Sequence, residues 1–244
     1  MSTTIVATTW QEDLTASCRR IAAGVLGGFV AGAVVGGIGG RIAMFVLRLT
    51  SDPALHGRQT DDGFVIGELS SATLFLVGFT AALGVLGALF YLVVRGWLPA
   101  TWRAPLAGVF GGIVGGALVI QPGGIDFTLL EPLWLAIAMF IALPALFGVV
   151  MSLLVERFRA PDSGFARSRV WFLGLVPLIA IVFSGVRVLA VAAVVLAAWL
   201  LRRAVPDVAA WWRSAPVVWT GRVALVAFTG WALTILVSDV IEIL

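Results

Sequence analysis

Arginine and carboxylate side chains gather near the predicted outer ends of the apolar segments, and they are the residues best suited to chemistry. Arg41 and Arg48 are seven residues apart, close to two helical turns, so they share one face of a helix. Two guanidinium groups on one face can bind an anionic group bidentately. Glu68, Asp126 and Glu131 are the carboxylates expected at the same level. The pattern predicts an outward-facing vestibule for an anionic ligand or a lipid headgroup.

A plainer interpretation of the same residues stays open. Arg41 and Arg48 could extend toward the lipid headgroups and bind their phosphates, with the acidic loop simply solvated. Membrane lipids are then the ligand.

Known catalytic patterns are absent from the sequence. It contains neither a Gly-x-Ser-x-Gly nor a His-Glu-x-x-His motif. All 16 basic residues are arginine, which excludes a lysine Schiff base and the lysine of a P-loop. With one histidine, His56, and one cysteine, Cys18, neither a bis-histidine haem nor a zinc site is available. We predict no catalytic residues, no metal and no cofactor; an enzyme acting on a lipid-linked substrate is the least supported class.

The composition is that of an integral membrane protein. Hydrophobic residues make up 61% of the 244 residues and the mean hydropathy is +1.08; soluble domains have about 45–50% apolar residues. A spanning chain must satisfy its backbone internally, so we predict an all-α polytopic transmembrane helix bundle. Residues 1–20 are expected to form a cytoplasmic tail, and residues 21–244 a single transmembrane domain with a polar outer loop at 50–68.

Apolar runs divide the domain into about seven predicted spans. They are Ile21–Leu49, Leu69–Val94, Ala104–Ile120, Pro132–Val155, Val170–Ser184, Val188–Leu201 and Val217–Val237. The fifth and sixth are short for a bilayer of about 30 Å. They form either two crossings or a partly re-entrant hairpin.

The arginines predict the orientation, since cytoplasmic loops are enriched in basic residues. With seven spans and a cytoplasmic N-terminus, four basic groups fall inside and most carboxylates outside. The groups are Arg19/Arg20, Arg95/Arg103, Arg157/Arg159/Arg167/Arg169 and Arg202/Arg203/Arg213. The C-terminus is then outside. These short basic loops are explained by topology, so nucleic-acid binding has no support.

Glycine recurs at every fourth position in two predicted spans. The residues are Gly24, Gly28, Gly32, Gly36 and Gly40 in the first, and Gly108, Gly112 and Gly116 in the third. Such small-residue rows allow close helix approach in lipid, within the chain or against a partner. Ala23–Val30 also aligns with Ala107–Val114, which suggests a parallel duplication of spans one-two and three-four.

Two function classes follow. The first is an accessory or assembly subunit of a membrane complex that packs through glycine-rich helices, with a membrane protein or a second copy as partner. The alternative is a small transporter or channel for an anionic or lipid-like solute, which the prolines Pro144 and Pro177 within predicted spans favour. The composition, rich in Ala, Gly and Arg, is typical of a high-GC bacterium and predicts a multi-pass protein of the cytoplasmic membrane.

Overall fold

The computed structural model describes residues 10–52, 71–124, 127, 131–178 and 208–244. Within these residues the regular structure is helical, and five helices are long and apolar enough to cross a membrane. The five are Gln11–Thr50, Leu74–Val94, Ala100–Val119, Leu133–Arg159 and Ala215–Ile243. An all-helical fold with membrane-type helices is therefore confirmed. Seven spans, their orientation and the duplication stay predictions, and the predicted pair Val170–Leu201 lies largely outside the described residues.

The first of these helices is one unbroken rod made of three segments. The α-helix α1 (Trp10–Ala31) continues into a π-helix (Gly32–Gly39) and then into α2 (Gly40–Thr50). The residues at both junctions keep right-handed helical backbone angles, so the chain direction is maintained. The rod begins at Trp10, so it includes about half of the stretch expected to be a tail.

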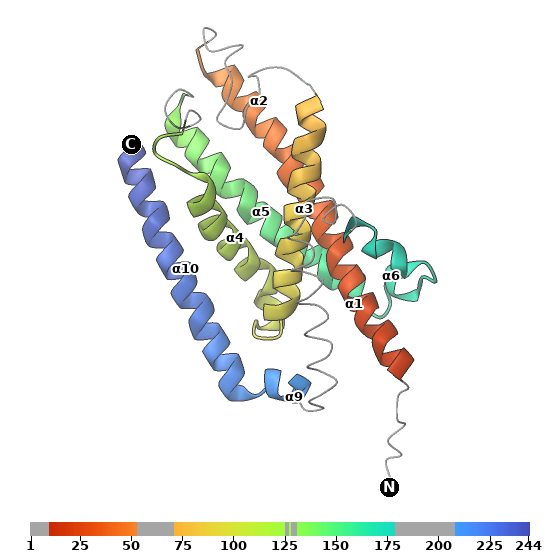
Figure 1. The fold of residues 1–244 in the computed structure, drawn as a ribbon. Helices are drawn as coiled ribbons and strands as arrows, with labels where there is room; N and C mark the ends of the chain where they lie inside the picture. Colours follow the sequence, from red (N-terminus) through yellow and green to blue (C-terminus); the bar gives the residue numbers. More distant parts are fainter. Residues whose placement is uncertain (1–9, 53–70, 125–126, 128–130, 179–207) are drawn as a thin grey trace.

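The remaining long helices run alternately in opposite directions (Figure 1). They are α3 (Ser71–Val94), α4 (Arg103–Val119), α5 (Leu133–Arg159) and α10 (Ala215–Ile243). We call the end at which α1, α4 and α10 begin the amino end of the bundle. The opposite end, where α2, α4 and α10 finish, is the carboxy end.

Short helical turns lie near the amino end. A 3₁₀ turn (Ala100–Trp102) leads into α4, and α6 (Gly164–Arg167) and a second 3₁₀ turn (Trp171–Leu175) follow α5. The second turn packs against α1. Helix α9 (Val208–Trp212) leads into α10.

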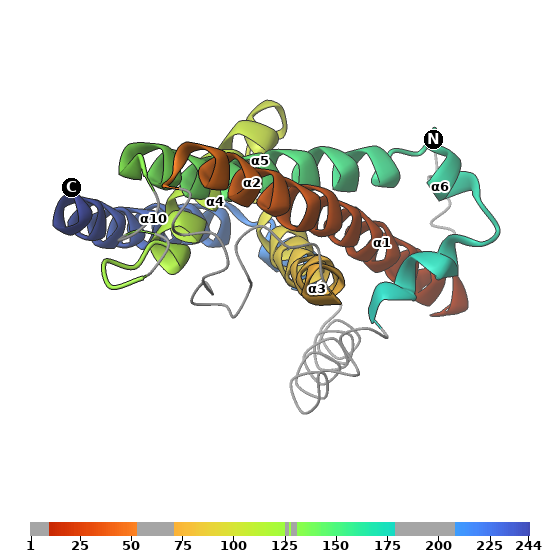
Figure 2. The same ribbon diagram turned by 90° about the horizontal axis from the view of Figure 1, so that it is seen from above.

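Helices α1 and α3 approach each other through backbone atoms. A Cβ atom added at Gly28 would meet the carbonyl oxygen of Gly84, and one added at Gly84 would meet the carbonyl oxygen of Gly28. Gly32 has the same relation to the carbonyl of Thr80. Figures 1 and 2 show the two helices in contact where they cross. Side chains larger than hydrogen at these positions would push the helices apart.

The α4–α5 contact uses small residues in the same way. A Cβ at Gly111 would meet the carbonyl oxygen of Pro144, and one at Gly148 would meet the carbonyl oxygen of Ala107. Gly115 faces the Pro144 ring. Pro144, inside α5, is thus packed into the glycine face of α4.

Apolar side chains complete the core at both ends. At the carboxy end, Leu47, Ile120 and Leu236 are buried together with the first turns of α5. Toward the amino end, Tyr91 and Val155 are buried between α3, α4 and α5. In contrast, α10 lies at the edge of the bundle and packs on α4.

Candidate functional site

The predicted outer vestibule is only partly described. Arg41 and Arg48 lie half-buried on α2, and both take part in polar or electrostatic interactions. Glu131 lies exposed just before α5, at the same carboxy end. Glu68 and Asp126 lie outside the described residues. The vestibule therefore stays a prediction.

Ser51, directly after α2, hydrogen-bonds to the backbone just before α5, and Glu131 forms no ion pair with any of the described residues. The Ser51 hydroxyl donates to the carbonyl oxygen of Leu47 at 2.8 Å and accepts from the backbone N–H of Glu131 at 3.0 Å. Ser51 is buried, so these hydrogen bonds are shielded from competing water.

This geometry yields a first prediction at the carboxy end. Replacing Ser51 by alanine leaves the Glu131 N–H without its acceptor, so we expect a loss of about 1–2 kcal/mol in the free energy of unfolding. Glu131→Gln keeps the backbone contact and should cost less than about 0.5 kcal/mol. Unfolding of both variants in mixed detergent micelles measures the difference. Equal losses would show that the Glu131 side chain, and not its backbone, joins the helices.

The eight predicted packing glycines fall into two groups. The first group, in α1 and the π-helix, lies against Leu92, Gly84, Ala88, Thr80 and Ala81 of α3 and consists of Gly24, Gly28, Gly32 and Gly36. The second group, in α4, lies against α5 and consists of Gly108, Gly112 and Gly116. Leu236 of α10 is also near Gly116. Gly40 is the exception, since a Cβ there would meet nothing within 4 Å. In both groups the main neighbour of the glycines is the next long helix along the chain.

The most highly connected polar residue in the described structure is Glu156, near the last turn of α5 at the amino end. Its Oε1 accepts from the Tyr91 hydroxyl at 2.9 Å and from Arg95 Nε at 2.8 Å. Its Oε2 accepts from Arg95 Nη2 at 2.6 Å and from Arg103 Nη1 at 3.3 Å. Arg95 therefore binds both oxygens of the carboxylate, and this bidentate geometry is the strongest for an arginine–carboxylate pair. We call these four residues the Glu156 hub.

Three helix ends position the hub. Arg95 directly follows the last residue of α3, and Tyr91 precedes it by one turn on the same face. Arg103 is the first residue of α4, and Glu156 lies three residues before the end of α5. The hub thus ties together α3, α4 and α5 at the place where the bundle meets the predicted cytoplasmic boundary.

The opposite charges of Arg95 and Glu156 stabilise each other in the hub. The side chains of Arg95 and Glu156 are 20% and 31% exposed, so water screens the pair only in part. The hydrogen bond to Glu156 raises the pKa of Arg95 above its ordinary value, against the opposing effect of burial. Arg95 therefore stays cationic at every physiological pH.

One further arginine, Arg159, lies beside the hub without forming a hydrogen bond to Glu156. Arg159, one turn after Glu156, lies within electrostatic range of Arg20, Arg95 and Arg103. Neither Arg159 nor Arg20 forms an ion pair in the described part of the chain. The amino end therefore carries more positive charge than its one hub carboxylate neutralises.

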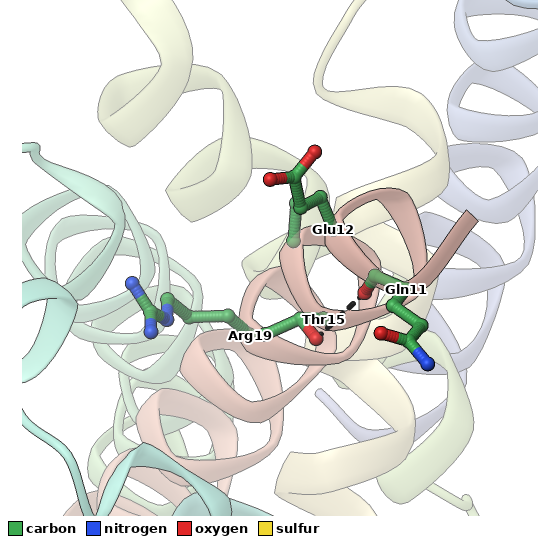
Figure 3. A pocket seen from close by; sticks show the side chains of 5 residues that line it. Gln11, Glu12, Thr15 and Arg19 are labelled. Atoms are coloured by element: carbon green, nitrogen blue, oxygen red, sulfur yellow. Dashed lines mark hydrogen bonds between the residues drawn. The ribbon is translucent and has the colours of Figure 1, made fainter. Parts of the chain in front are cut away.

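A shallow hollow of about 400 Å³ lies beside the first turns of α1. It is lined by Gln11, Glu12, Thr15, Ala16 and Arg19. Figure 3 shows Thr15 bonded to the Gln11 backbone, at 2.7 Å, and the Arg19 guanidinium extending away from both. Arg19 instead donates to the carbonyl oxygen of Ala166 and lies over the Trp171 ring. The hollow is open and shallow, and we assign it no ligand.

Glu156 is not among the site residues predicted from the sequence, whose carboxylates all lie near the predicted outer ends of the spans. A usable signal was present. Glu156 directly follows the predicted span Pro132–Val155 and precedes Arg157, so it is an acid placed at a boundary that is otherwise basic. An acid in such a place requires an arginine partner.

Comparison of the chain with protein-family models, with curated proteins and with solved structures finds no match.

Proposed function

We propose that the protein is an accessory or assembly subunit of a larger membrane complex, and that α10 binds a transmembrane helix of its partner. One observation carries the proposal. Helix α10 presents Gly230, Thr234 and Ser238, small residues spaced four apart, on an exposed face. Rows of this kind let another helix approach closely in lipid.

The chain itself shows how it uses such rows. Gly28 of α1 and Gly32 of the π-helix lie against α3, and Gly111 and Gly115 of α4 lie against α5. In each case the small residues face the backbone or ring of a neighbouring helix. Gly230 differs, because a Cβ there would meet nothing within 4 Å. The row on α10 is therefore built like the internal contacts and has open space in front of it.

The row points away from the rest of the bundle. Ala232 and Leu236 are the buried residues of this part of α10, and Leu236 lies near Gly116 of α4. Thr234 and Ser238 each follow one of them by two residues, about 200° around the helix, and so occupy the opposite face. A shallow, mainly apolar groove of about 510 Å³ runs along this face, lined by Leu233, Thr234, Val237, Ser238 and Ile241.

Charge favours a different protein over a second copy as the occupant. Continuing the row by four residues leads to Glu242, which is exposed. Copies of a membrane protein share one orientation, so two α10 helices would pair in parallel and bring their Glu242 side chains together. Like charges at that position oppose the pairing. A partner helix with small residues and a neutral or basic group at the Glu242 level fits better.

The transporter alternative has less geometric support. Pro144, which would mark a broken helix beside a transport path, packs against Gly111 and Gly115. The hollows described above are shallow and open. Helices packed backbone to backbone at two contacts suit a scaffold better than a moving carrier.

The test uses one substitution at two exposed glycines. We expect Gly230→Leu to lower the amount of partner that copurifies with the tagged protein from its native membrane by at least about tenfold, because the leucine fills the row. Gly78→Leu is the control, since Gly78 of α3 is also exposed and has nothing within 4 Å. Quantitative mass spectrometry of the purified complexes gives the readout.

Two outcomes would contradict the proposal. One is a partner that both leucine variants retain in full, which would place the contact elsewhere. The other is a homo-oligomer that Gly230→Leu dissociates, which would make the second copy the occupant despite Glu242.

A further inference from the structure

We infer that the amino end of the bundle binds a phosphate group through Arg159, together with Arg103 and Arg20. This site is separate from the α10 face and does not depend on the proposed assembly function. Its ligand is a phosphate monoester or diester, carried either by a membrane lipid or by a soluble molecule.

The first step is the charge balance around Glu156. Arg20, Arg95 and Arg103 each lie within electrostatic range of Arg159, so four arginines gather there. Both oxygens of the Glu156 carboxylate already accept two hydrogen bonds each. Three positive charges therefore remain in excess, and the carboxylate has little capacity left for Arg159.

The second step is the state of the guanidinium donors. The Nε atoms of Arg103 and Arg159 are buried from solvent, and neither finds a hydrogen-bond acceptor in the described part of the chain. A buried donor without an acceptor is costly, more so when it belongs to a charged group. Asp162, three residues after Arg159 in the sequence, pairs instead with the exposed Arg157 at 3.8 Å. A bound anion would supply the acceptor that these two donors lack.

The third step is the kind of acceptor that fits. Guanidinium groups bind phosphate bidentately, and a phosphate offers several oxygens and negative charge to arginines from different helices. The site also lies at a level marked by tryptophans, where the tilted rings of Trp97 and Trp212 pack with their centroids 5.0 Å apart. Indole rings settle at the level of lipid headgroups. A phosphate at this level neutralises part of the excess positive charge and also accepts hydrogen bonds from the unsatisfied guanidinium donors.

Native mass spectrometry of the full-length protein in detergent tests this site with phosphatidic acid as the probe and phosphatidylcholine as the comparison lipid. We expect phosphatidic acid to bind more tightly, and Arg159→Gln to weaken that binding about tenfold. Arg157→Gln is the matched control. It removes the same charge only two residues from Arg159, and the Arg157 side chain is 70% exposed. It should leave binding within about twofold of the original protein.

Added inorganic phosphate separates the two sources of ligand. Displacement of the lipid by millimolar phosphate indicates a site for a soluble phosphate, and resistance indicates a headgroup site. Should Arg159→Gln not fold, Arg20→Gln on the exposed face of α1 replaces it, with a smaller expected loss of about threefold. Equal affinity for the two lipids, or equal losses for Arg159→Gln and Arg157→Gln, would overturn the inference.

Discussion

Gly28→Ala is expected to destabilise the protein by about 1–3 kcal/mol or to prevent its folding, although it adds a single methyl group. The new Cβ would collide with the carbonyl oxygen of Gly84 and with the Cβ of Ala88. A carbonyl oxygen belongs to the backbone of α3 and cannot rotate away as a side chain can. The methyl group must therefore separate α1 from α3 along part of their contact.

Gly40→Ala provides a control from the same glycine row. A Cβ at Gly40 meets nothing within 4 Å, so the substitution has no steric cost. Alanine favours a helix over glycine by about 1 kcal/mol, which makes a neutral or slightly stabilising effect the expected result. Thermal unfolding of both variants in one detergent gives the comparison. Similar stability of the two variants would show that the α1–α3 contact yields easily and that the row has no packing role.

The long helices could be predicted from the sequence because each contains a continuous apolar run long enough to cross a membrane. The predicted span Leu69–Val94 corresponds to α3, Ser71–Val94, and Ala104–Ile120 corresponds to α4, Arg103–Val119. A membrane-spanning helix satisfies its own backbone, so length and composition are enough to locate it. The start of α1 at Trp10 was missed because its first residues are polar and lack a hydropathy signal.

The neighbour of each glycine could not be predicted in the same way. Glycine at every fourth residue predicts that one face of a helix has no side chains. It does not predict which helix packs against that face. The row that begins at Gly24 also fails to predict where the contact ends. Gly37, outside the row, lies against Val77, whereas Gly40, inside it, faces open space. The π-helical turns between residues 32 and 39 change the angular spacing, so a pattern drawn for an α-helix loses its register there.

The Glu156 hub shows a second limit of sequence reasoning. Its hydrogen bonds join residues 65, 61 and 53 positions apart, from three different helices. Each arginine alone is explained by the excess of basic residues at the predicted cytoplasmic boundary. Only the arrangement of the helix ends brings them to one carboxylate, and that arrangement depends on the glycine contacts between the helices.

Glu156→Gln is expected to lower the free energy of unfolding by about 2 kcal/mol. Removing one member of a buried ion pair leaves its partner uncompensated, which costs about 3–5 kcal/mol when the pair is fully buried. The partial exposure of Arg95 and Glu156 reduces that cost. Asp162→Asn is the control, since it breaks the exposed pair with Arg157 and should cost less than about 0.5 kcal/mol.

The same substitution is expected to act in the opposite direction on phosphate binding. Glutamine keeps one acceptor oxygen but no negative charge, so the charges of Arg95 and Arg103 are no longer neutralised and add to that of Arg159. Phosphatidic acid should therefore bind Glu156→Gln more tightly than the original protein and raise its unfolding temperature by a larger amount, because a ligand stabilises the folded state in proportion to the logarithm of its affinity. Unfolding temperatures with and without the lipid measure both effects in one experiment. A variant that is less stable and gains nothing from the lipid would show that the hub joins the helices but does not share its arginines with a ligand.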